Sequence, residues 1–339
     1  MTRDAVLLGS PVEPVKQGEA VSEPSDLERF IGYARVFEVA QAVDAWNLLE
    51  PYYTEAAVHV VHDAGSMGDD ARGRAAVISA VSQSVLDHDR RFDVRIPEIL
   101  EGPLARPDGI WMRYGLTLRR EGLPELRLSG EHLTTYTDGL ISRIEEWMAP
   151  GTAQRVEAYF AEHASALRPA GSAAATPSAH DLRDLEEATA RSMVRAYGSA
   201  KSQQDVGAAL STCSEDFVLE TPAFGTRGVG RQEVAAQLAV FFSAFPDYNV
   251  ELEGFAHGDA LVAWGRARIS FRGEFIGIAA TQKTADLEVM CLFDIEQGSL
   301  RRERFIFDRA GFCEQLGISA ADLATARALV RGMAAGSGE

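Results

Sequence analysis

Residues 126–148 read LRLSGEHLTTYTDGLISRIEEWM, two runs of alternating residues separated by a turn signal at Asp138-Gly139. Alternation of this kind is typical of a β-hairpin with one face packed on a core. On the first strand, the more apolar face carries Leu126, Leu128, Gly130, His132, Thr134 and Tyr136. On the second strand, the face with Ile144 and Met148 also carries Glu146. The pattern therefore predicts one imidazole and one carboxyl group on the inner faces of neighbouring strands.

Whether His132 and Glu146 meet depends on the turn between them. A turn with an odd number of residues, such as a three-residue loop with a glycine bulge, makes them cross-strand or diagonal neighbours. A two-residue turn would put the two side chains on opposite faces of the hairpin. The sequence leaves both alternatives open.

The hairpin closes the first of two similar halves. Each half opens with a helical pattern, at residues 27–37 and 182–197, and continues with a short helix that leads into a strand. A Gly-Arg pair then opens another helix, and long strands with turn signals end each half. Helices first and antiparallel strands last indicate an α+β fold, in which a bent, mostly antiparallel sheet wraps around helices and leaves a conical cavity.

The domain boundaries follow from composition. Residues 167–180 read LRPAGSAAATPSAH and predict a flexible linker, because they are rich in Ala, Ser, Pro and Gly without apolar periodicity. A chain of 339 residues has the length of two domains. We therefore predict domains at residues 25–166 and 181–325, with loose tails at residues 1–24 and 326–339.

Charge and composition exclude several classes of protein. The chain has 33 basic and 50 acidic residues and a formal net charge of −17, which disfavours nucleic acid and anionic membrane surfaces as partners. Three cysteines at unrelated spacings indicate neither a disulfide framework nor a metal knuckle. The sequence shows no membrane span or signal peptide, so a cytoplasmic location is expected.

The second half carries a set of motifs that resembles a known family. These are FPDY at residues 245–248, GDALVAW at 258–264, GEFIG at 273–277, FIFD at 305–308 and EQLG at 314–317. The set resembles the SnoaL-like polyketide cyclases of the NTF2-like superfold, which also contains ketosteroid isomerases. The first half matches more weakly, chiefly through its final hairpin. The resemblance implies two tandem cone-shaped domains, a pocket at the wide end of each cone, and pairing through the sheets as an intrachain pseudo-dimer or a homodimer.

The resemblance also implies a site. In this family, a His seven residues before the turn glycine and an acidic residue seven after it handle the substrate proton. His132 and Glu146 hold these offsets from Gly139, with Glu in place of the family's Asp. Glu146 would move the proton, and His132 would hold the enolate oxygen or orient the acid. The residues expected to line the substrate cavity of this half are Phe37, Tyr114, Tyr136, Ile144 and Met148.

The second half lacks this pair, because the same offsets from Gly298 give Cys291 and Phe305. Its inner face is expected to offer Tyr197, Glu303 and Phe305 for substrate binding. The alternative is that Tyr197 only lines a pocket and Glu303 lies at its rim. Thr221 stands where a ketosteroid isomerase has its general base. The set of catalytic residues of that enzyme is therefore incomplete in this half.

Other polar residues are less informative. His59, His62 and Asp63 lie on the early strand of the first half, where the sequence does not decide which face each side chain takes. Asp87-His88-Asp89 is interpreted as a solvated turn rather than a metal site. We expect no metal and no cofactor, since the chain lacks the phosphate-binding and dinucleotide-binding motifs.

The main hypothesis is a cofactor-independent cyclase or isomerase that uses acid/base chemistry on a small apolar carbonyl compound, such as a polyketide intermediate. One alternative is epoxide opening within the same superfold, for which Asp63 is the sole candidate acid on the early strand. Another alternative is a binding or assembly module without catalytic activity.

Overall fold

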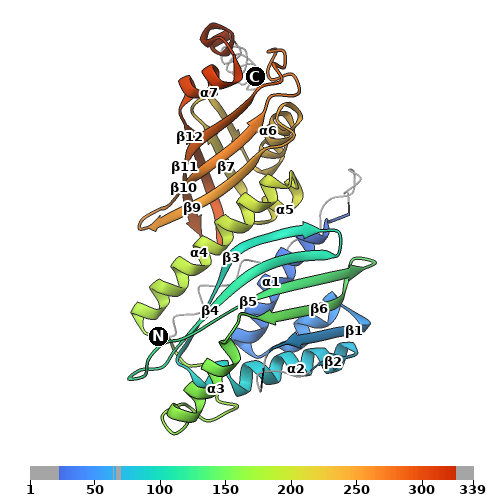
Figure 1. Ribbon diagram of the computed structural model, residues 1–339, viewed down its shortest axis with the longest axis vertical. Helices are drawn as coiled ribbons and strands as arrows, with labels where there is room; N and C mark the ends of the chain where they lie inside the picture. The colour runs from blue at the N-terminus through green and yellow to red at the C-terminus, as the bar shows by residue number, and fades with distance from the viewer. Residues whose placement is uncertain (1–22, 64, 66–69, 326–339) are drawn as a thin grey trace. The chain divides into compact units, whose positions relative to one another are not determined.

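The computed structural model describes residues 23–63, 65 and 70–325, which fold into two units, each with a six-stranded sheet (Figure 1). The units divide at Arg195/Ala196. The α+β class with two tandem domains is confirmed. The predicted tails lie almost wholly outside the described residues.

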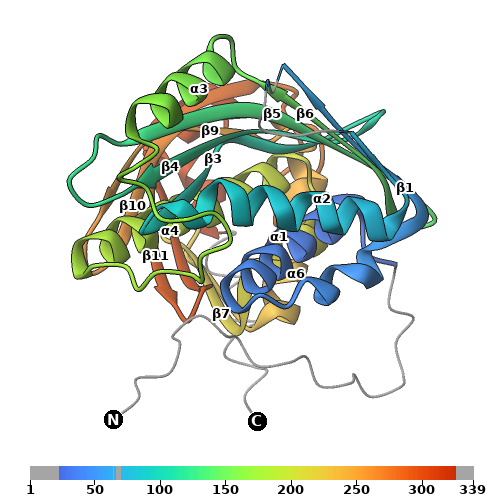
Figure 2. The same cartoon turned by 90° about the horizontal axis from the view of Figure 1, so that it is seen from below.

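Unit 1 has the sheet order β2-β1-β6-β5-β4-β3, with β1 and β6 parallel and the other neighbours antiparallel. Helices α1 and α2 lie on the same side of strands β3 to β6 (Figure 2). The elements in chain order are α1 (Asp26–Val43), η1 (Trp46–Tyr52), β1 (Tyr53–His62), β2 (Ala71–Arg72), α2 (Arg74–Asp87), η2 (Asp89–Arg91), β3 (Val94–Arg106), β4 (Gly109–Arg119), β5 (Leu126–Thr137), β6 (Leu140–Met148) and α3 (Thr152–His163).

Unit 2 repeats this plan with the order β8-β7-β12-β11-β10-β9, again with one parallel pair, β7 and β12. The elements are α4 (Ala179–Ser202), which begins in unit 1, α5 (Val206–Ser211), β7 (Cys213–Thr221), β8 (Thr226–Val229), α6 (Arg231–Ala244), β9 (Asn249–His257), β10 (Leu261–Ser270), β11 (Thr284–Glu296), β12 (Ser299–Phe307) and α7 (Arg309–Leu316). The Asp308 side chain caps α7 by accepting hydrogen bonds from the backbone nitrogens of Ala310 and Gly311.

Local chemistry explains how α1 comes to lie against the first sheet. The Ser25 hydroxyl accepts a hydrogen bond from the backbone nitrogen of Glu28 at 3.0 Å and so caps the start of the helix. Buried Tyr33 and Ala40 of α1 pack in one cluster with Tyr53 and Ile144 from the sheet. The first strands and the closing hairpin are therefore held against the same helix.

The turn between β5 and β6 differs from the arrangement that the candidate pair required. Thr137 pairs with Leu140, which leaves a two-residue loop in which Asp138 and Gly139 both have positive φ, at 51° and 74°. The register then shifts, because Tyr136 pairs with Ile141 but Thr135 pairs with Arg143. Ser142 is the extra residue of a β-bulge. This extra residue places His132 and Glu146 on the same face of the hairpin, which the two-residue turn alone would have prevented.

Unit 2 contains the same combination. Glu296 pairs with Ser299 across a two-residue loop, and the register shifts between Asp294 and Ile295, so that Arg301 is the extra residue. A shared turn and a shared bulge at equivalent places support the interpretation of the two halves as repeats.

The predicted linker at residues 167–180 overlaps α4 by its last two residues, since α4 begins at Ala179. The division at Arg195/Ala196 falls inside α4. The domain boundaries given from composition stay predictions. None of the described helices has the length and apolarity that crossing a membrane requires.

Candidate active site

The closing hairpin of unit 1 places His132 and Glu146 directly opposite each other on β5 and β6. The Nδ1 atom of His132 lies 3.5 Å from Oε1 of Glu146. The other ring nitrogen, Nε2, hydrogen-bonds with the Thr134 hydroxyl at 2.7 Å. Both nitrogens of this imidazole are thus directed at protein groups, which fixes the ring beside the carboxylate.

A second imidazole, that of His59 on β1, reaches the same carboxylate. Its Nε2 atom lies 3.6 Å from Oε1 of Glu146. Among the described residues, neither ring nitrogen of His59 has a hydrogen-bond partner, and the residue is only 8% exposed. A buried imidazole without a partner is uncommon, so His59 is a functional candidate.

The opposite oxygen of Glu146 faces a tyrosine. The Tyr114 hydroxyl on β4 lies 3.5 Å from Oε2 of Glu146 and 3.8 Å from the sulfur of Met148. Burial raises the pKa of Tyr114 well above its ordinary value, and the charge of Glu146 adds to this rise. The phenol therefore remains a hydrogen-bond donor at neutral pH.

The three side chains of this cluster differ in their exposure to solvent. The side chain of Glu146 is 26% exposed, whereas the side chains of His59 and His132 are 10% and 9% exposed. Glu146 is therefore the most exposed of the three side chains.

The environment keeps Glu146 ionised. Burial on its own raises the pKa of this carboxyl, but the contact with His132 and the electrostatic attraction of His132 and His59 outweigh burial and lower the pKa. At neutral pH the group is an anion, able to accept a proton and unable to donate one until it has done so.

This lowered pKa has a consequence for stability. A carboxyl group in an unfolded chain has a pKa of about 4.3. The ionised Glu146 therefore stabilises the fold fully above about pH 4.3, and this contribution is lost as the pH falls towards the lower folded value. We expect the difference in thermal-unfolding midpoint between wild type and Glu146→Gln to shrink on acidification from about pH 6 to about pH 3. Thermal unfolding followed by circular dichroism at several pH values measures it, and a difference that grows on acidification would contradict the assignment.

The other residues expected in the cavity of this half have different surroundings. Ile144 is 2% exposed and belongs to the core cluster, so it is closed to a ligand. Phe37 packs on Tyr33 and Trp46. The buried hydroxyl of Tyr136 has no hydrogen-bond partner among the described residues. Tyr114 and Met148 are the two that lie beside Glu146.

The structure decides the face of His62, which the sequence left open, and corrects the interpretation of Asp89. His62 faces away from the cluster, because it stacks on Trp147 at a ring separation of 5.0 Å and lies 3.3 Å from Glu145. Asp89 is not in a solvated turn, since its carboxylate accepts a hydrogen bond from Arg95 at 2.8 Å and is 14% exposed. Within the described residues, no group of His, Cys, Asp and Glu is arranged to hold a metal ion.

Unit 2 has a different polar cluster at the place expected for substrate binding. Glu303 is 1% exposed and thus lies deep in the unit, not at the rim of a pocket. Its carboxylate accepts a hydrogen bond from the Tyr197 hydroxyl at 2.6 Å and two from Lys201, at 2.8 and 2.9 Å. Sequence reasoning missed Lys201, although it follows Tyr197 by one helical turn and therefore shares its face of α4.

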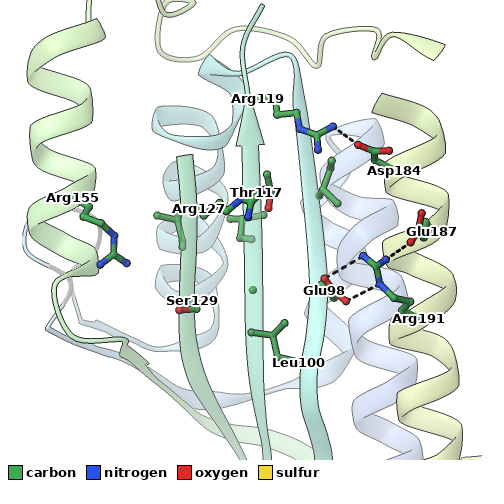
Figure 3. A pocket seen from close by; sticks show the side chains of 14 residues that line it. Glu98, Leu100, Thr117, Arg119, Arg127, Ser129, Arg155, Asp184, Glu187 and Arg191 are labelled. Atoms are coloured by element: carbon green, nitrogen blue, oxygen red, sulfur yellow. Dashed lines mark hydrogen bonds and ion pairs between the residues drawn. The ribbon is translucent and has the colours of Figure 1, made fainter. Parts of the chain in front are cut away.

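A recess of about 660 Å³ lies on the other face of the first sheet, over β3, β4 and β5 and beside α4 (Figure 3). Its arginines are largely neutralised, because Arg119 pairs with Asp184 at 2.6 Å and Arg191 pairs with Glu98 at 2.9 Å. None of the predicted site residues lines it.

Comparison with known proteins places the family resemblance in unit 2. Residues 191–316 match the SnoaL-like polyketide cyclase family. This match confirms the resemblance inferred from the motifs of the second half. No curated protein matches the chain.

Several solved structures are similar to about two fifths of the chain. A protein from Jannaschia sp. CCS1, described as a SnoaL-like polyketide cyclase, is 18% identical, with 39% of this chain and 93% of that chain covered and a TM-score of 0.36. A protein with a ketosteroid isomerase-like fold from Catenulispora acidiphila is 14% identical, with 38% and 95% covered and a TM-score of 0.35. A protein from Xanthomonas campestris, described as a polyketide cyclase, is 20% identical, with 38% and 96% covered and a TM-score of 0.35.

Proposed function

We propose that unit 1 is a cofactor-independent enzyme that moves a proton next to a carbonyl group in a small apolar compound, such as a polyketide or another secondary-metabolite intermediate. One observation carries the proposal: an accessible carboxylate, that of Glu146, lies within 3.6 Å of two imidazoles and within 3.5 Å of a phenol. A carboxylate and a neutral donor in one partly apolar site are the groups that enolisation needs.

Glu146 is the base in this proposal. Its oxygen takes the proton from the carbon next to the carbonyl, and the electron pair of that C–H bond moves to give an enolate. Because the lowered pKa makes this carboxylate a weak base, the reaction requires a donor that stabilises the enolate oxygen. We propose the Tyr114 hydroxyl as this donor, because it lies 3.5 Å from Glu146, at the limit of a hydrogen bond, and remains protonated.

Of the two roles that the family resemblance implied for His132, holding the enolate oxygen or orienting the acid, we propose the second. Since its two nitrogens are directed at Glu146 and Thr134, it has no nitrogen left for a substrate, and we propose it as a positioning residue. His59 supports the same carboxylate from β1.

Two products are compatible with the enolate. Return of the proton from Glu146 to a different carbon completes an isomerisation. Attack of the enolate carbon on a second carbonyl of the same molecule forms a C–C bond and completes a cyclisation, with the proton passing from Glu146 to the new alkoxide.

Hydrogen–deuterium exchange tests the proposed chemistry without knowledge of the natural substrate. The probe is 2-tetralone, a small ketone with acidic protons next to its carbonyl, incubated with the full chain in D₂O and followed by proton NMR. We expect the wild-type chain to accelerate exchange above the buffer rate. An exchange rate equal to that of buffer alone, with 2-tetralone bound, would contradict the proposal.

A binding role without catalysis is the second candidate, favoured by the burial of both imidazoles. The same experiment separates the two, because a binding module would bind 2-tetralone without accelerating exchange. Epoxide opening has less support, since Asp63, its candidate acid, is exposed and follows the last residue of β1.

A further inference from the structure

Unit 2 has a cavity of its own, of about 330 Å³, within the range of small-molecule sites. It is lined by side chains from β7, β8, α6 and β12, and most of them are apolar. The aromatic and aliphatic lining includes Leu219, Phe224, Leu238, Phe241, Tyr248, Phe275 and Phe305. Such a lining suits a flat, largely apolar molecule.

Lys201 brings a hydrogen-bond donor to this cavity. Its side chain is 7% exposed, and its ammonium donates to both carboxylate oxygens of Glu303. An ammonium has three N–H groups, so two such bonds leave one N–H for another acceptor. The nitrogen lies 5.2 Å from the centre of the Phe305 ring, which itself lines the cavity.

The other charged or amide side chains of the lining already have partners. Gln237 donates to the Thr226 hydroxyl at 2.9 Å, and Glu233 accepts from the backbone nitrogen of Val229 at 2.8 Å. Arg227 pairs with Glu220 at 3.3 Å. Lys201 is therefore the buried charged side chain of the lining that has a donor left for a ligand.

The positive charge of Lys201, unlike its remaining N–H group, is not available to a ligand. Glu303 neutralises it inside the unit, and Tyr197 also donates to that carboxylate. A ligand carboxylate would therefore add a buried negative charge without a matching positive one, which is unfavourable. A neutral carbonyl oxygen accepts the remaining N–H without this penalty.

We propose that this cavity is a second ligand site, selective for a neutral planar aromatic carbonyl compound over the corresponding carboxylate. Lys201 donates to the carbonyl oxygen, Glu303 holds Lys201 in place, and the aromatic lining packs on the ring system. The site lies wholly in unit 2 and does not depend on the chemistry proposed for Glu146.

Isothermal titration calorimetry on the full chain tests the selectivity. The probes are 2-acetylnaphthalene and 2-naphthoate, which have similar shapes but differ in charge. We expect the ketone to bind at least about tenfold more tightly than the carboxylate. No binding of the ketone, or equal or tighter binding of 2-naphthoate, would overturn the proposal.

A double variant, Lys201→Met with Glu303→Gln, tests the location. It removes both charges together, because removal of one alone would leave its partner buried and unpaired. We expect at least about a tenfold loss of affinity for 2-acetylnaphthalene. The matched control is Lys283→Met, the same substitution at an exposed lysine of the same unit, which should bind as wild type. Circular dichroism verifies that both variants fold. Unchanged affinity in a folded double variant would overturn the proposed site.

Discussion

Replacement of Glu146 by Gln is expected to lower the rate of 2-tetralone exchange by about 10²- to 10⁴-fold, the range that a general base contributes. Gln keeps the shape of the side chain and its contact with Tyr114 but cannot accept a proton from carbon. The dissociation constant for 2-tetralone, measured by calorimetry, should change little. The loss should therefore appear in the rate and not in binding.

The neighbouring residue provides a matched control. Glu145 points to the other face of β6, where it accepts a hydrogen bond from Arg143 at 2.7 Å and lies 3.3 Å from His62. Glu145→Gln makes the same chemical change one residue away and should leave the exchange rate unchanged. Equal losses in the two variants would indicate that strand β6 had been disturbed and that Glu146 has no special role.

Replacement of Glu303 by Ala is expected to lower the free energy of unfolding by about 3–5 kcal/mol, the range found when one partner of a buried ion pair is removed. The change leaves the Lys201 ammonium, 7% exposed, without its carboxylate and removes the acceptor of the Tyr197 hydroxyl. Urea unfolding measures the loss. The double variant Lys201→Met with Glu303→Leu should recover much of it, because no buried charge then remains.

An exposed ion pair in the same unit provides the comparison for this loss in the free energy of unfolding. Arg266 and Glu253 lie 3.4 Å apart with side chains 69% and 57% exposed, so Glu253→Ala should cost at most about 1 kcal/mol. Similar costs for Glu303→Ala and Glu253→Ala would show that burial of the Lys201–Glu303 pair has no energetic consequence.

The sequence determined the faces of the closing hairpin but not its register. Alternation alone put His132 and Glu146 on inner faces, since the side-chain period of a strand is two. The two-residue turn at Asp138-Gly139 would have separated them, and only the bulge at Ser142 brings them together. A bulge adds one residue to one strand without a distinctive composition, which is why the sequence did not show it.

Sequence reasoning left the face of His59 undecided and missed Lys201, for related reasons. His59 meets Glu146 through the parallel pairing of β1 with β6, between segments more than 80 residues apart. Lys201 meets Glu303 across about 100 residues, from helix to strand. Local patterns give the face of each element, but contacts at such separations depend on the packing of the whole unit.

The family match and the proposed chemistry fall in different units. Residues 191–316 match the SnoaL-like cyclases, yet in this half the positions equivalent to His132 and Glu146 are Cys291 and Phe305. The structure offers a Lys201–Glu303 pair beside a largely aromatic cavity instead. We infer that the two repeats have separated their roles, with proton transfer in unit 1 and ligand binding in unit 2.

The most direct measurement is the exchange rate of 2-tetralone in D₂O with wild type and with Glu146→Gln, side by side at one neutral pH and equal saturation. We expect the wild-type rate to exceed that of the variant by at least about 100-fold. Equal rates in the two folded proteins would contradict the assignment of Glu146 as the base.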